Sequence, residues 1–140
     1  MGHLRGIRKS DQAHEISAWI AKEEDDDLAW VAVNNGSSFQ ISKVILSTVN
    51  VQGKASKGVD APNGYRSYLS IVPPGIYYTR IQIQHGMSFL SGLEIAFLDK
   101  EGQGWVRDGD GIIIRIKQFP YEYYEIPLPI SWEQPKDRMT

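Results

Sequence analysis

The spacing of hydrophobic residues changes once along the chain, near residue 28. Before that point they recur at intervals of three and four residues, the period of an amphipathic helix, at Ala13, Ile16, Trp19 and Ile20. We therefore predict a helix over residues 9–22, with Ser10 or Asp11 as its N-cap. The acidic run at residues 23–27 has no hydrophobic position, which predicts a solvated linker.

After residue 28 the pattern becomes that of short strands separated by Gly, Pro and Asn turns. The predicted strands cover residues 28–33, 39–51, 65–72, 76–84, 93–99, 104–108 and 112–119. The second of them carries hydrophobic side chains on both faces, which predicts a bulge or burial on both sides. Because no helix separates these strands, we predict a mainly β domain over residues 28–126. Its expected architecture is an antiparallel immunoglobulin-like sandwich of about seven strands, preceded by one N-terminal amphipathic helix.

The two ends of the chain have a different character. Residues 1–8 predict a flexible N-terminus, and residues 127–140 form a tail rich in Pro and aromatic residues. Pro127 and Pro129 exclude a central strand in that tail. An edge strand around residues 121–126 remains compatible with the sequence.

Composition narrows the class of protein. The chain has 140 residues, 41% of them hydrophobic, which is enough for the core of one soluble domain. It has no Cys, a net charge of -2 and no apolar run as long as a bilayer span. Because the net charge is slightly negative, we expect no nucleic-acid partner. Because no apolar run is long enough to span a bilayer, we expect no membrane insertion by this chain. The expected location is the cytoplasm, or the soluble part of a longer membrane-anchored protein.

Four carboxylates in residues 99–111 suggest a cation site. They are Asp99, Glu101, Asp108 and Asp110, in a stretch punctuated by Gly. Their spacing does not match a calcium-binding loop, and Arg107 places a positive charge among them. Two strand-to-strand turns explain the same residues, with Trp105 directed into the core.

A resemblance rests on three motifs. They are V-x-N-x-S at Val33, Asn35 and Ser37, P-P-G at residues 73–75, and F-x-D-x-x-G-x-x-W-x-R-D-x-x-G from Phe97 to Gly111. Together with the upstream residues 12–19, they resemble a domain of uncharacterised, chiefly actinomycete bacterial proteins. The resemblance covers roughly residues 9–116. It implies a β-sandwich module and lends no catalytic residues, because no activity is established for that group.

No catalytic, cofactor-binding or metal-binding constellation can be assembled from the sequence. The three His residues, at positions 3, 14 and 85, are not at metal-ligand spacing. We therefore predict that the protein is not an enzyme. The expected function is a non-catalytic protein–protein interaction or accessory module, which binds a protein partner or a second copy of itself. The alternative is a carbohydrate-binding sandwich that uses exposed aromatic residues. The candidate partner-binding residues are Ile16, Trp19, Tyr121, Tyr123, Tyr124 and Trp132.

Overall fold

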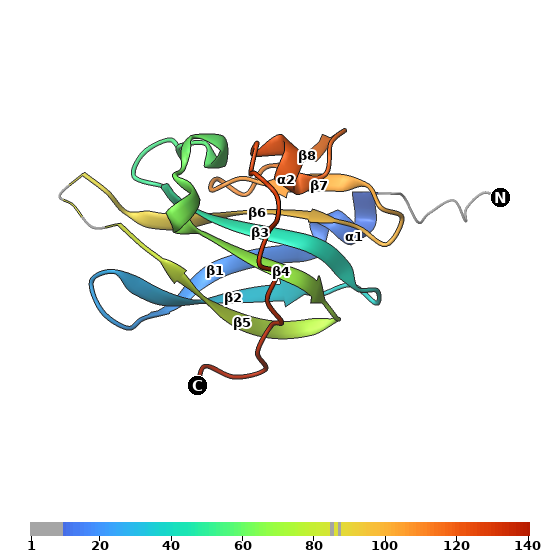
Figure 1. Cartoon of the computed structure of the whole chain (residues 1–140), viewed down its shortest axis with the longest axis horizontal. Helices are drawn as coiled ribbons and strands as arrows, with labels where there is room; N and C mark the ends of the chain where they lie inside the picture. The colour runs from blue at the N-terminus through green and yellow to red at the C-terminus, as the bar shows by residue number, and fades with distance from the viewer. Residues whose placement is uncertain (1–9, 85, 87) are drawn as a thin grey trace.

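The computed structural model describes residues 10–84, 86 and 88–140, and it has a β-sandwich-like fold of two antiparallel sheets (Figure 1). The first sheet, sheet A, has the strand order β1 (Ile16–Glu23), β2 (Leu28–Asn35) and β5 (Gly75–Gln82). The second, sheet B, has the order β4 (Arg66–Val72), β3 (Ile41–Asn50), β6 (Ser91–Leu98), β7 (Gly104–Arg107) and β8 (Ile113–Ile116). The prediction of a mainly β domain is confirmed.

The helical elements are all short. They are α1 (Ser10–His14), α2 (Pro120–Tyr123) and the single 3₁₀ turns η2 (Gly58–Asp60) and η3 (Asn63–Tyr65). Neither described α-helix has the length or the apolar character needed to cross a membrane.

The predicted helix over residues 9–22 is wrong. Only α1 is helical, and residues from Ile16 onward form β1, which pairs antiparallel with β2. Ile16, Ala18 and Ile20 follow the two-residue period of a strand and face the core, and Ile16 and Ile20 also fit the spacing of a helix. Backbone hydrogen bonds to β2 favour the strand over the helix in this segment. The acidic residues that follow connect β1 to β2, and Asp25 Oδ1 accepts the N–H groups of Asp27 and Leu28.

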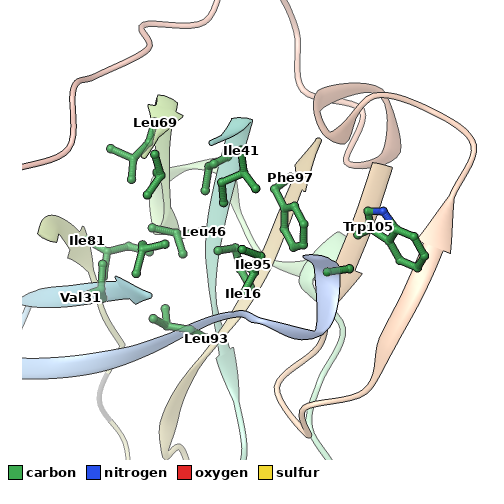
Figure 2. Packing of buried hydrophobic residues seen from close by; sticks show 14 of the residues in the cluster. Ile16, Val31, Ile41, Leu46, Leu69, Ile81, Leu93, Ile95, Phe97 and Trp105 are labelled. Atoms are coloured by element: carbon green, nitrogen blue, oxygen red, sulfur yellow. The ribbon is translucent and has the colours of Figure 1, made fainter. Parts of the chain in front are cut away.

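The main core lies between the two sheets (Figure 2). Phe97 and Ile95 of β6 meet Ile16 of β1 and Val31 of β2, and all four side chains are almost fully buried. The bulge predicted in the second strand is confirmed, because the pairing of β3 with β6 shifts between Ser42 and Ile45 and Lys43 has a φ of 50°. This shift puts Ile41 on the same core-facing side of sheet B as Val44 and Leu46, whereas Ile45 faces the outer cluster.

A second apolar cluster covers the outer face of sheet B, the face directed away from sheet A. Ile45, Ala96 and Val106 of the sheet pack there against side chains of α2 and the residues that follow it. The edge strand considered for residues 121–126 is therefore wrong. Pro120 begins a helical turn instead, and Glu122 caps it by accepting the Phe119 N–H at 3.0 Å.

The turn predicted after β2 carries the chain from one sheet to the other. The buried Asn35 side chain holds this corner: its amide donates to the carbonyls of Phe39 and Val72 at 2.8 and 3.0 Å. Its Oδ1 accepts the Ser37 N–H at 3.0 Å. One amide side chain thus fixes the loop to the end of β4.

A substitution of Trp105 tests whether this residue belongs to the main core. Its side chain is buried in the main cluster, and its indole N–H donates to Asp99 Oδ2 at 2.9 Å. We expect Trp105→Ala to lower the free energy of unfolding by about 3 to 5 kcal/mol, measured by urea denaturation. Trp105→Phe should cost less, because it retains an aromatic ring. A loss below about 1 kcal/mol for the alanine variant would place Trp105 outside the core.

Candidate interaction surface

The six candidate partner-binding residues fall into three different environments. Ile16 lies in the main core and is fully buried, so it offers no surface to a partner. Trp19, on the opposite face of β1, is 43% exposed. The four aromatic residues of the tail belong to the cluster on the outer face of sheet B: Tyr121, Tyr123, Tyr124 and Trp132. The structure therefore leaves Trp19 as the most accessible of the six.

The C-terminal tail crosses from one sheet to the other and pairs with an edge of each (Figure 1). Glu133 donates its N–H to Tyr68 of β4 at 2.9 Å and accepts the Ser70 N–H at 3.0 Å. Lys136 exchanges both of its backbone hydrogen bonds with Tyr78 of β5, at 2.7 and 2.9 Å. β4 and β5 are the outermost strands of their sheets on this side. The tail thus bridges to each of these two edges at a single position.

The opposite edge of sheet A, at β1, has no strand partner among the described residues. Gly36 donates its N–H to the Glu15 carbonyl at 2.9 Å, which sets the alternation of the ladder with β2. By that alternation Ser17 and Trp19 bond to β2, whereas Ala18 and Ile20 direct their N–H and C=O groups away from it. This row of backbone groups is available to an added strand.

Trp19 stands beside this edge on the outer face of sheet A. The register aligns Trp19 of β1 with Ala32 of β2 and Tyr78 of β5, so the three side chains share one face. The small alanine lies between two aromatic residues. We call Trp19, Ala32 and Tyr78 the aromatic row.

A charged cluster borders the aromatic row. Trp30 donates its indole N–H to Glu24 at 3.1 Å, and the Arg80 guanidinium lies 4.6 Å from the Trp30 ring centre. Arg80 also forms an ion pair with Glu24 at 3.1 Å. Because these groups cover Trp30, that residue is buried although it lies on an outer face.

A buried polar group anchors α2 to sheet B. Tyr124 donates its hydroxyl to Glu94 at 2.7 Å, and the Gly58 N–H donates to the other carboxylate oxygen at 3.0 Å. Arg66 stacks on the Tyr124 ring at 4.4 Å. Burial raises the pKa of Glu94, although the bonds from Tyr124 and Gly58 oppose that rise. A Cβ at Gly58 would lie 2.0 Å from the Glu94 carboxylate, so the close approach requires glycine there.

The carboxylates of residues 99–111 organise turns. Asp99 Oδ1 accepts the N–H groups of Glu101 and Gln103, both at 2.9 Å. Asp108 Oδ1 accepts those of Asp110 and Ile112. Gly102 and Gly111 take the positive φ values of these turns, 80° and 86°. Among the residues that the structure describes, no group of three or more acidic or His side chains is arranged to hold a metal ion.

Arg107, the positive charge among these carboxylates, donates to three carbonyls, those of Ile16, Gly111 and His14, at 2.8, 2.9 and 3.0 Å. It therefore ties β7 to the start of β1 across the two layers.

Sequence reasoning missed Tyr78 and the open edge of β1. Tyr78 could not be paired with Trp19 while Trp19 was assigned to a helix, because their alignment depends on the register of three strands. The alternation of Ile16, Ala18 and Ile20 was the signal that favoured a strand.

Comparisons of the chain with models of known protein families, with curated proteins and with solved structures find no match.

Glu94 makes the stability of the fold depend on pH. Its pKa is raised in the folded protein above the ordinary value of 4.5, so the folded state binds the proton more tightly than the unfolded chain does. The resulting stabilisation is fully present below pH 4.5 and is lost as the pH rises through the raised pKa. We expect the free energy of unfolding of the wild type, relative to Glu94→Gln, to increase as the pH falls through that window. The limit is about 1.4 kcal/mol for each unit by which the pKa is raised.

Urea titrations at a series of pH values measure this difference, and Glu101→Gln at an exposed turn controls for the loss of one carboxylate. A wild-type advantage that shrinks as the pH falls would contradict the expectation.

Proposed function

We propose that the protein is a non-catalytic interaction module that binds an extended segment of another protein along β1. One observation carries the proposal: the backbone groups of Ala18 and Ile20, which have no partner among the described residues, lie next to the exposed Trp19. An extended segment can add to such an edge through main-chain hydrogen bonds, and side-chain contacts then supply specificity. Exposed Trp side chains are frequent energetic centres of interfaces.

The arrangement of the layers favours a slender partner at this edge. Sheet B continues through β7 and β8 after sheet A has ended at β1 (Figure 1). Arg107 of β7 donates to the Ile16 carbonyl of β1 at 2.8 Å. A second sandwich joined edge to edge at β1 would have to place its own sheet B in the volume that β7 and β8 occupy. A single extended strand needs only the space beside β1.

The aromatic row supports a second candidate function, carbohydrate binding. Trp19 and Tyr78 flank a small residue on a sheet face, and sugar rings stack on aromatic side chains arranged in this way. The polar residues Ser17 and Asn34, aligned in the next row, offer hydrogen bonds to hydroxyl groups. Native gels containing soluble polysaccharides test this candidate, because retardation by one polysaccharide that both Trp19→Ala and Tyr78→Ala abolish would favour it.

We also propose that the sandwich is immunoglobulin-like. The first, second and fifth strands form one sheet, and the third, fourth, sixth and seventh lie in the other. This division, with connections that cross between the sheets, is compatible with a Greek-key sandwich to which β8 is added.

Selection of binders from a random peptide display library tests the proposed function. We expect bound peptides to shift the amide NMR signals of Ala18 and Ile20, because those groups gain hydrogen bonds. Trp19→Ser should weaken the selected peptides by about tenfold or more. Leu128→Ser, which removes an exposed apolar side chain from the tail, should not.

Peptides that shift signals elsewhere and bind Trp19→Ser as tightly as the wild type would contradict the proposal.

A further inference from the structure

The outer edge of sheet B, at β8, is open as well. β8 pairs with β7, and no described residue pairs with its other side. Asp108 donates its N–H to the Ile112 carbonyl at 3.0 Å, and this bond sets the alternation of the ladder. Ile114 and Ile116 therefore bond to β7, whereas Ile113 and Arg115 direct their backbone groups outward.

Three exposed apolar side chains accompany this edge. Ile112 is 58% exposed, Ile114 is 46% exposed, and Phe119, just after the strand, is 44% exposed. Ile114 pairs with Val106, which belongs to the outer-face cluster, so Ile114 lies on the same face as that cluster. Neighbouring exposed apolar residues at an open edge indicate a surface that becomes covered by a partner.

Charge is distributed unevenly along the same segment. The turn before β8 carries the acidic residues Asp108 and Asp110. The basic residue Arg115 lies in the second half of β8, and the basic residue Lys117 follows directly after the strand. Asp110, Arg115 and Lys117 are exposed. An antiparallel copy of the segment would place the basic end of one chain beside the acidic end of the other. The segment is therefore complementary in charge to itself.

We propose that two copies of this chain associate through antiparallel pairing of their β8 strands. The register that uses the outward groups centres on Ile114. Ile113 of each copy exchanges its backbone hydrogen bonds with Arg115 of the second copy, and the two Ile114 side chains meet at the twofold axis. Lys117 then lies opposite Gly111 of the second copy. Because glycine has no side chain, Lys117 can reach the neighbouring Asp110 carboxylate.

The shape of the molecule permits this pairing. β8 is the outermost strand of sheet B and lies beyond the edge of sheet A at β1 (Figure 1). A second copy can therefore continue sheet B without bringing the two A sheets into contact. The paired strands are short, so the interface is small and the association depends on protein concentration. This assembly uses a different edge from the peptide-binding site proposed at β1, so either can exist without the other.

Sedimentation equilibrium of the full chain between about 10 µM and about 1 mM tests the proposal. We expect a monomer–dimer equilibrium whose dimer Kd rises as salt is added, because salt screens the charge pairs. Lys117→Asp and Asp110→Lys each bring like charges together twice in the symmetric dimer, so each should raise the dimer Kd by about tenfold. The double variant Asp110→Lys/Lys117→Asp restores opposite charges and should return the Kd to within about threefold of the wild-type value.

Two controls make the result specific to β8. Circular dichroism and thermal unfolding check that each variant is folded, since Asp110 also accepts the Ala55 N–H at 3.2 Å. Lys22→Asp makes the same change of charge on β1 and should leave the Kd unchanged. A wild type that is monomeric at every concentration would overturn the proposal. A double variant no better than the single ones, or a dimer broken by Lys22→Asp, would overturn it equally.

Discussion

The unpaired backbone groups along the outer strands of each sheet are the constraint around which this molecule is arranged. Two open sheets have four edges, and each edge presents N–H and C=O groups that need a partner or water. The tail supplies partners on one side, through Glu133 to β4 and Lys136 to β5. Its prolines lack an N–H and prevent it from forming a longer strand, so it makes single bridges. The edges of β1 and β8 have no strand partner among the described residues, and they are the edges at which we propose binding.

Buried polar side chains fix the elements that the ladders do not reach. The amide of Gln12 donates to two carbonyls of the loop before β3, and its oxygen accepts the Lys100 N–H at 2.8 Å. Arg107 adds bonds to His14 and Ile16. An isolated five-residue helix has no stability of its own in water, so α1 depends on these side-chain bonds. The same bonds place the start of β1 at the edge of sheet A, and therefore also position Trp19.

Much of the fold could be predicted because its signals are local. The strands after residue 28 are short apolar runs; β2 and β3 end at Asn, and β4 ends just before Pro73. The acidic residues 99–111 contain Asp and Gly at turn positions. The N-terminal segment could not be assigned in this way, because Ile16 and Ile20 fit the period of a helix as well as that of a strand. The choice depends on pairing with β2, whose Asn35 lies opposite Ile16 but far from it in sequence. The path of the tail is a non-local outcome too. Its prolines excluded a central strand, but nothing near Lys136 identifies Tyr78 as its partner.

Of the residues that the sequence suggested for a binding surface, Trp19 alone lies on the surface proposed at β1, and the reason for selecting it was wrong. Trp19 was selected as part of a helical stripe, yet it is exposed because it alternates with Ala18 and Ile20 in a strand. The aromatic residues of the tail were selected for their number, and they pack on sheet B because α2 brings Tyr124 within reach of Glu94. Exposure alone does not mark a binding site, since Leu128 is more exposed than Trp19. Leu128 lies in the Pro-rich tail, whereas Trp19 and Ile114 lie in edge strands whose backbone can bond to another chain. The combination of an apolar side chain and an edge without a partner among the described residues, rather than either feature alone, is the reason for proposing β1 and β8 as binding surfaces.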